Sequence, residues 1–165
     1  MHFDGLNQTN AQPGVLALPQ AMLEESLDAA FSRFGQETVG PQVRFRILLE
    51  GQPRPMHPFI QEEVYRIGRE ALLNAFRHSE ATRVELHLRY TPPGLHIAVH
   101  DNGKGISADL LRAAACDGLR WMHEMAERIG AKLKLLSRVK AGTEILLFIP
   151  GEISFASQTV FRVCA

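Results

Sequence analysis

The amino-acid sequence predicts an α+β domain, a two-layer α/β sandwich in which helices cover one face of a mixed, mostly antiparallel sheet. Segments with apolar residues at helical spacing are interspersed with segments in which apolar and polar residues alternate, as in half-buried strands. Two alternating segments flank the turn Thr91-Pro92-Pro93-Gly94, which predicts a hairpin with one face toward helices and one toward water. No internal repeat is visible, and 165 residues suffice for one domain with a sizeable core.

The first half of the chain predicts a flexible start, two helices and a strand. Residues 1–18, with Asn, Gln, Gly and Pro, are typical of a linker or flexible N-terminus. An amphipathic helix is predicted for residues 19–35, ending at its glycine, and a strand for residues 43–49. After a loop with three prolines, a long helix is predicted for residues 59–78, with the core stripe Ile60, Val64, Ile67, Ala71 and Ala75.

The second half continues with strands and helices. Strands are predicted for the apolar-alternating segments 83–89, 95–100, 133–135 and 145–149. A short alanine-rich segment spans residues 108–115, and a helix is predicted from residue 119 to its end at Gly130. For residues 151–165 the sequence leaves open whether they add an edge strand, pack back on the sheet or form a tail.

Composition excludes several classes of protein. Lys plus Arg and Asp plus Glu each number 18, so the net charge is zero and no strong field favours nucleic acid. The apolar runs are too short to span a bilayer, and Met1-His2-Phe3-Asp4 does not resemble a signal peptide, so we expect no direct membrane insertion. Cys116 and Cys164 lack metal-ligand spacing and are interpreted as free thiols, which predicts a cytoplasmic location.

The segment Asp101-Asn102-Gly103-Lys104-Gly105-Ile106 places a carboxylate on a glycine-hinged loop after a strand. The two glycines would let the backbone approach a flat ligand closely. The Asp101 carboxylate could accept the exocyclic amino group of adenine, and Thr143, after Gly142, could complete that contact. Taken alone, both segments are also ordinary turn sequences, so the interpretation depends on the rest of the chain.

On the predicted long helix, Glu70, Asn74 and either Arg77 or His78 are three or four residues apart and share one stripe. Asn74 offers an amide oxygen to magnesium, which takes oxygen ligands. Glu70 could orient or deprotonate an attacking nucleophile, and Arg77 could reach a phosphate. The alternative is an ordinary polar stripe on an amphipathic helix.

Taken together, four ordered motifs resemble the ATP-binding domain of sensor histidine kinases, a member of the gyrase, heat-shock chaperone, histidine kinase and MutL ATPase group with the Bergerat fold. The resemblance runs from about residue 18 to residue 150, which sets the expected catalytic domain at 19–150. Residues 69–78 and 127–130 are similar to the short-lid subfamily of nitrate and desaturase sensors. The motifs are Glu70-x-x-x-Asn74, Asp101-x-Gly103-x-Gly105-Ile106, Gly118-Leu119-x-x-Met122 and Gly142-Thr143.

The resemblance implies ATP and Mg²⁺ as ligands and assigns a role to each motif. Asn74 would coordinate magnesium beside Glu70, the candidate catalytic base, with Arg77 near the phosphates and His78 near the ligand. Asp101 would bind the adenine amino group. The wall around it and the closure of the pocket would come from Gly103, Gly105, Ile106, Gly118, Leu119, Met122, Gly142 and Thr143.

Two departures from the family pattern leave alternatives open. Ala115 and Asp117 stand in a segment where the family has further glycine, and the lid between Ile106 and Gly118 is short, which could weaken ATP binding. No phosphoacceptor hairpin is recognised, because His123-Glu124 fits its pattern only superficially and is predicted to be a helical surface pair.

The implied function is therefore the ATP-binding catalytic domain of a two-component sensor histidine kinase. It would donate the γ-phosphate to a histidine on a separate dimerisation domain. Its partners would be that phosphoacceptor domain and, through it, a response regulator. The alternatives are a stand-alone serine kinase of the anti-sigma-factor type and a degenerate interaction domain that no longer binds ATP.

Overall fold

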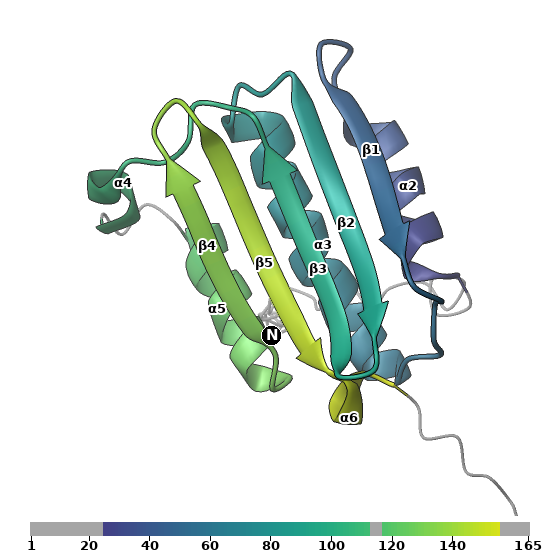
Figure 1. Cartoon of the computed structure of the whole chain (residues 1–165). Helices are drawn as coiled ribbons and strands as arrows, with labels where there is room; N and C mark the ends of the chain where they lie inside the picture. Colours follow the sequence, from purple (N-terminus) through teal and green to yellow (C-terminus); the bar gives the residue numbers. More distant parts are fainter. Residues whose placement is uncertain (1–24, 113–116, 156–165) are drawn as a thin grey trace, which may run out of the picture.

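The computed structural model describes residues 25–112 and 117–155, which form one five-stranded sheet with helices (Figure 1). The strand order is β1-β2-β3-β5-β4. Strand β1 pairs with β2 in parallel, and the other neighbours pair antiparallel, which confirms the mixed, mostly antiparallel sheet. The strands are β1 (Arg44–Glu50), β2 (Arg83–Thr91), β3 (Gly94–Asp101), β4 (Lys132–Arg138) and β5 (Gly142–Pro150).

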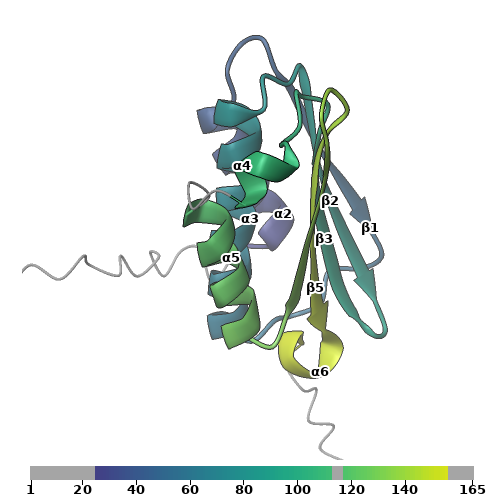
Figure 2. The ribbon, with the colours of Figure 1, turned by 90° about the vertical axis from the view of Figure 1, so that its left-hand side faces the viewer.

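The described helices lie on one face of this sheet, which confirms the predicted two-layer arrangement (Figure 2). Two short helices, α4 (Ala108–Arg112) and α6 (Gly151–Ser154), flank the layer formed by the longer ones. No helix in the described part of the chain is long and apolar enough to cross a membrane. The longer helices are α2 (Leu27–Thr38), α3 (Pro58–His78) and α5 (Asp117–Arg128).

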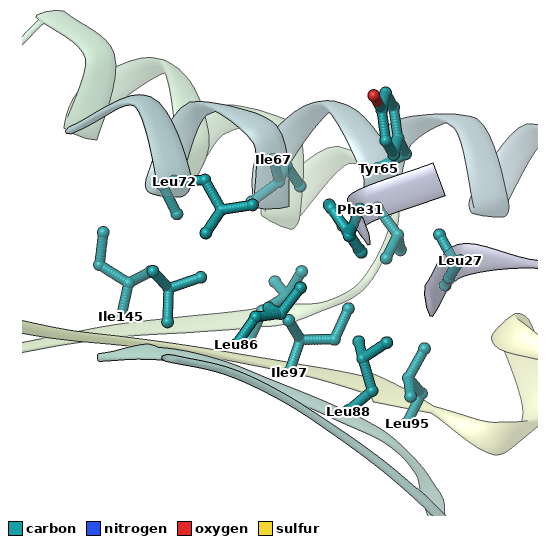
Figure 3. Packing of buried hydrophobic residues seen from close by; sticks show 14 of the residues in the cluster. Leu27, Phe31, Tyr65, Ile67, Leu72, Leu86, Leu88, Leu95, Ile97 and Ile145 are labelled. Carbon is teal, nitrogen blue, oxygen red and sulfur yellow. The ribbon is translucent and has the colours of Figure 1, made fainter. Parts of the chain in front are cut away.

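The core lies between the helices and the inner face of the sheet (Figure 3). Alternation along β2 buries Val84, Leu86 and Leu88 completely, as the period of two predicts. Phe31 of α2 is also fully buried and packs against Gly68 of α3, where an added Cβ would lie 2.5 Å from the Phe31 ring. The glycine therefore lets α2 approach α3 closely, and both helices pack against the sheet.

The predicted bounds of the first helix are wrong at both ends of its described part. Ser26 has an extended backbone, with φ −67° and ψ 152°, so α2 begins at Leu27, whereas residues 19–24 lie outside the described residues. At the other end the helix continues through Gly35 to Thr38. Gly35 is buried under Phe45 of β1, whose Cε1 would lie 2.0 Å from an added Cβ. The glycine thus serves helix–sheet packing and does not end the helix.

Residues 151–155 pack back on the domain, which is one of the three arrangements that the sequence left open. Phe155 forms an isolated antiparallel bridge with Met56, and the His57 N–H donates a hydrogen bond to the Ser154 carbonyl at 3.1 Å. The Arg54 guanidinium lies 3.8 Å from the centre of the Phe155 ring, a cation–π contact. Residues 156–165 lie outside the described residues.

A buried carboxylate joins α3 to α5. The Glu63 side chain is 3% exposed, and its Oε2 lies 3.2 Å from the Arg128 guanidinium. We expect Arg128→Ala to lower the free energy of unfolding by about 1–3 kcal/mol, because it removes a counter-charge from a buried carboxylate. Urea unfolding followed by circular dichroism measures this change. In the double variant with Glu63→Gln, part of the loss should be recovered, because an amide needs no counter-charge; an unaltered single variant would contradict this role.

Candidate active site

A cleft of about 560 Å³ opens between the C-terminal half of α3, the ends of β3 and β5 that lie beside it, and the start of α5. It brings together residues that are far apart in the sequence, and each of the four motifs contributes at least one of them. The predicted site residues that line it are Glu70, Asn74, Arg77, His78, Asp101, Gly105, Ile106, Gly118, Leu119 and Thr143.

One wall of the cleft is the polar stripe of α3. Glu70 and Asn74 are half-buried, and Arg77 and His78 are exposed at the C-terminal end of the helix. Gly118, near the start of α5, faces this stripe: an added Cβ would lie 2.7 Å from Glu70 Oε1 and 3.8 Å from Asn74 Nδ2. The glycine therefore leaves the carboxylate and the amide uncovered on the side of α5.

Asp101 ends β3 at the bottom of the cleft and is 5% exposed. Its Oδ1 accepts a hydrogen bond from the Gly103 N–H at 2.8 Å. Burial raises the pKa of the Asp101 carboxyl, and hydrogen bonds from the backbone of Gly103 and Thr143 oppose this effect only in part. With the apolar side chains of Val99 and Ile145 also lining the cleft, this buried carboxylate is suited to bind a flat apolar group that carries a hydrogen-bond donor.

The glycine loop fits closely between α3 and the turn joining β4 to β5. An added Cβ on Gly103 would lie 2.1 Å from the Ser79 carbonyl oxygen. Gly105 has φ +69°, and an added Cβ there would lie 2.2 Å from the Arg138 carbonyl oxygen. Between them, the Lys104 N–H donates to the Ser79 carbonyl at 2.8 Å. Gly103 is therefore not a lining residue of the cleft but holds the backbone that shapes it.

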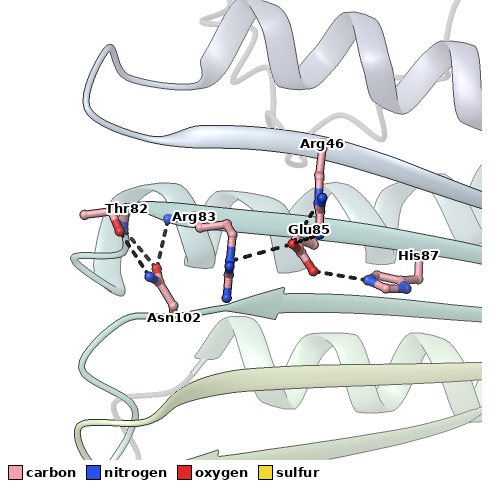
Figure 4. Close-up of polar contacts among 6 residues, drawn as sticks. All are labelled: Arg46, Thr82, Arg83, Glu85, His87 and Asn102. Carbon is pink, nitrogen blue, oxygen red and sulfur yellow. Dashed lines mark hydrogen bonds and ion pairs between the residues drawn. The ribbon is translucent and has the colours of Figure 1, made fainter.

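Asn102, a motif residue to which the sequence assigned no role, fastens this loop to the sheet (Figure 4). Its Oδ1 accepts hydrogen bonds from the backbone N–H groups of Thr82 at 3.0 Å and Arg83 at 2.9 Å. Its Nδ2 donates to Thr82 Oγ1 at 3.0 Å. Asn102 thus faces away from the cleft, toward the start of β2. The segment Asp101-Asn102-Gly103 can therefore form a turn and still leave the cleft side of the loop open to a ligand.

Ser137 is a supporting residue that sequence reasoning missed. Its Oγ accepts a hydrogen bond from the Ile106 N–H at 2.8 Å, donates to the Gly142 carbonyl at 3.1 Å and lies 2.9 Å from Thr143 Oγ1. It therefore joins the glycine loop to the end of the cleft where Thr143 lies. The sequence does contain a signal for Ser137, because it is a small polar residue on the same face of the strand as Leu133 and Leu135.

Besides Gly103, two more predicted site residues, Met122 and Gly142, lie apart from the cleft lining. Met122 is 0% exposed within the core and does not line the cleft, although Leu119, one helical turn earlier, does. Gly142 has φ +91°, and an added Cβ would lie 1.9 Å from the Asp101 carbonyl oxygen. Gly142 therefore permits the close pairing of β3 and β5 beside Asp101.

The acidic departure from the family pattern, Asp117, does line the cleft. Its carboxylate lies 3.5 Å from the Arg120 guanidinium, and both side chains are largely exposed. At the rim, Lys104 Nζ lies 2.7 Å from Glu80 Oε1, so a second carboxylate is paired as well. Ala115 and the adjoining part of the lid lie outside the described residues.

The chemistry of the donor set fits a magnesium nucleotide. No cluster of three or more His, Cys, Asp or Glu side chains suited to a metal occurs within residues 25–112 and 117–155. Asn74 and Glu70 nevertheless supply oxygen atoms on one wall of the cleft, which suits Mg²⁺ that keeps phosphate and water ligands. The cleft is also large enough for a drug-sized ligand.

The chain is similar in sequence to sensor proteins of bacteria. The chain is 37% identical over 91 residues to the sensor histidine kinase LiaS of Bacillus subtilis, covering 55% of this chain and 25% of LiaS. It is 32% identical over 109 residues to the sensor protein VraS of Staphylococcus aureus, covering 66% of this chain and 31% of VraS. The chain therefore spans a quarter to a third of the length of these curated relatives.

Solved structures with the same fold include a histidine kinase domain from the blue-light activated histidine kinase EL346 of Erythrobacter litoralis. That domain aligns with a TM-score of 0.64 at 20% identity, over 76% of this chain and 61% of the other. The ATP-binding domain of PrrB from Mycobacterium tuberculosis aligns with a TM-score of 0.60 at 20% identity, over 76% of this chain and 94% of the other. Residues 60–153 match the family described as histidine kinase-, DNA gyrase B-, and HSP90-like ATPase, and the chain belongs to this family.

Proposed function

We propose that this chain is the ATP-binding catalytic domain of a two-component sensor histidine kinase. It binds MgATP in the cleft and donates the γ-phosphate to a histidine on a separate dimerisation domain. A response regulator is the partner reached through that domain. The observation that carries the proposal is the buried Asp101 carboxylate in one cleft with the Glu70–Asn74 wall of α3. Sensor kinases among the relatives support the same conclusion.

In this proposal Asp101 recognises the adenine base of ATP. A carboxylate that is almost wholly buried accepts a hydrogen bond from the exocyclic amino group of adenine, whereas guanine presents a carbonyl at the equivalent position and would leave Asp101 unpaired. Thr143 lies beside it and can complete the contact directly or through water. Gly105, Ile106 and Leu119 border the cleft near the base.

The opposite wall serves the phosphates. When bound, MgATP supplies the phosphoryl group and the metal charge that offsets the charge of the phosphates. The Asn74 amide oxygen would hold the metal, and the exposed Arg77 guanidinium would contact phosphate oxygens, with His78 beside them. Glu70 would accept the proton of the attacking imidazole and so orient its free nitrogen toward the phosphorus. Gly118 leaves the space that the phosphates need next to Glu70.

The two departures from the family pattern do not outweigh this support. The Asp117 charge is paired with Arg120 at 3.5 Å, so its repulsion toward phosphate is reduced. The two relatives compared above are sensor kinases, which favours a histidine acceptor over the serine acceptor of anti-sigma-factor kinases.

Calorimetric titration with ATP, with and without magnesium, tests the proposal, with GTP as the control. We expect saturable binding that selects adenine and that magnesium strengthens. Asn74→Ala should weaken MgATP binding by about tenfold or more, as expected for a lost metal ligand, and should change binding of metal-free ATP much less. Silence from a folded sample would instead support the degenerate interaction domain.

Phosphotransfer separates the two kinase alternatives. When the dimerisation domain of the parent kinase is supplied as a separate chain, label from γ-labelled ATP should appear on it in acid-labile form, because phosphohistidine hydrolyses in acid. Glu70→Gln should retain ATP binding and lose about 10²-fold or more of this transfer, the usual contribution of a general base. Acid-stable label would favour the serine kinase.

A further inference from the structure

The face of the sheet opposite the cleft carries no helix within the described residues (Figure 2). The strand residues that face away from the helices are mostly polar and form a continuous surface on all five strands. Arginine and lysine outnumber carboxylates on this open face, although the whole chain has a net charge of zero. The cations are Arg44, Arg46, Arg83, Arg89, Lys132, Lys134 and Arg138, and the carboxylates are Glu50, Glu85 and Glu144.

The open face is hollowed by a groove of about 500 Å³. Its floor is apolar and comes from Ala98 of β3 with Leu146 and Phe148 of β5. Because β3 and β5 lie between β2 and β4 in the sheet, the longer side chains of the outer strands form the walls. The walls include Glu50, His87 and Arg89 on one side and Lys132 and Lys134 on the other, so that cations outnumber carboxylates among the lining residues.

Two cations of the open face, Arg46 and Arg83, are paired with a carboxylate of the same face. Arg46 donates to Glu85 Oε1 at 2.7 Å, and Arg83 lies 3.6 Å from the same oxygen, so these guanidinium groups are already paired (Figure 4). Partial burial alone would raise the pKa of Glu85, but hydrogen bonds from Arg46 and His87 and the charges of Arg46 and Arg83 hold it below its ordinary value. The Glu85 carboxylate is therefore ionised and already paired with Arg46 and Arg83.

The cations on the walls of the groove are not occupied in this way. Within residues 25–112 and 117–155, Arg89, Lys132 and Lys134 make no ion pair with a carboxylate, although Glu50, also in the groove, lies opposite Arg89 in the register of β1 and β2. His96, also in the groove, stacks on Phe148 with ring centres 4.6 Å apart. Burial, and then the charge of Arg89, lower the pKa of His96, so its ring is uncharged at neutral pH. The groove thus combines an apolar floor with walls of net positive charge, where three cations outnumber the Glu50 carboxylate.

We propose that this groove docks an acidic segment of a partner protein. Carboxylates of the segment pair with Arg89, Lys132 and Lys134, while an apolar side chain of the same segment contacts Ala98, Leu146 and Phe148. The inference is independent of the nucleotide function, because these residues lie on the other face of the sheet from Asp101.

Three other occupants fit this chemistry less well. The His96 ring packs on Phe148, so that aromatic ring is not free to stack a nucleotide base. The apolar side chains form the floor of a hollow and do not project, as insertion into a lipid surface requires. Residues 156–165 of this chain contain Arg162 and no Asp or Glu, so they lack the complementary carboxylates.

The test uses a labelled synthetic peptide that alternates pairs of glutamate with single leucines, followed by fluorescence anisotropy. Lys132→Glu/Lys134→Glu should weaken binding about tenfold or more, because attraction becomes repulsion at one wall of the groove. Arg112→Glu/Lys140→Glu is the matched control: it makes the same change in net charge at exposed positions outside the groove and should change binding far less. Thermal melts followed by circular dichroism establish that both variants are folded.

Amide chemical-shift mapping supplies the second readout. Shifts caused by the peptide should concentrate at β3 and β5 around Ala98 and Phe148 and leave Asp101 unchanged. Equal affinity of the groove variant and the charge-matched control would overturn the proposal. So would shifts that gather elsewhere, or tighter groove-dependent binding of single-stranded DNA or of phosphatidylglycerol vesicles than of the peptide. ATP binding by the groove variant should equal that of the wild type, which separates this proposal from the nucleotide function.

Discussion

The Asp101→Asn variant should bind ATP about 10²-fold or more weakly than the wild type, while keeping its fold. The Gly103 N–H donates to Asp101 Oδ1 at 2.8 Å, and in the variant this hydrogen bond would hold the amide oxygen of asparagine. The amide NH₂ would then face the ligand, where adenine also presents a donor. Two donors in a buried site oppose binding, and calorimetric titration measures the loss.

The same variant should be as stable as the wild type at neutral pH, or more stable. Burial raises the pKa of Asp101 in the folded protein, so the folded state binds this proton more tightly than the unfolded state does. The free energy of unfolding therefore falls as the pH rises from below the ordinary value of 3.8 through the raised pKa of the folded state. Asparagine does not titrate, so the advantage of the variant should be greatest at neutral pH and vanish in acid, as urea unfolding across pH would record.

Asp109→Asn is the matched control for both measurements. Asp109 lies on α4, and its side chain is 95% exposed beside Arg112. Its replacement should leave ATP affinity and stability close to those of the wild type, because the side chain is almost fully exposed and outside the cleft. Unchanged ATP affinity in Asp101→Asn would remove Asp101 from the site.

The Gly142→Ala variant should lose about 2–3 kcal/mol of stability or more, together with much of its ATP affinity. An alanine Cβ at this position would lie 1.9 Å from the Asp101 carbonyl oxygen, and the residue has φ +91°, which side chains rarely adopt. The backbone of β3 must move to relieve the contact, and the Asp101 carboxylate moves with it. Urea unfolding and ATP titration measure the two effects.

Gly40→Ala provides the comparison for this substitution. No atom lies within 4 Å of an added Cβ at Gly40, so this variant should differ from the wild type by less than about 0.5 kcal/mol. If both alanine variants were equally stable, the close pairing of β3 with β5 beside the cleft would not depend on a glycine.

Local pattern predicted most of the fold because local pattern reflects what each segment buries. Alternation in β2, β3 and β5 gave the strands, and the spacing of Val64, Ile67, Ala71 and Ala75 gave the buried side of α3. The stripe of Glu70 and Asn74 follows from the same helical period, since it lies beside the buried one. These expectations needed no knowledge of the partners across the core.

Expectations that depended on contacts between distant segments could not be derived in this way. Gly35 has the pattern of a helix end, but it is buried against Phe45 of β1, which no local rule reveals. Met122 has the helical spacing of a pocket residue, yet its side chain lies in the core. Ser137 supports the glycine loop from β4, more than thirty residues along the chain from Ile106. The roles assigned to the site residues stay predictions until ligand binding is measured.

The cleft and the groove share strands β3 and β5, and neighbouring residues along each strand face opposite ways. Val99 and Asp101 face the cleft side, whereas Ala98 and His96 belong to the open face. A single-residue insertion or deletion within β3 would exchange these two sets of side chains, because the period of a strand is two. Homologous chains should therefore accommodate changes of length in the turns, and a shortened or lengthened β3 should disable both surfaces at once.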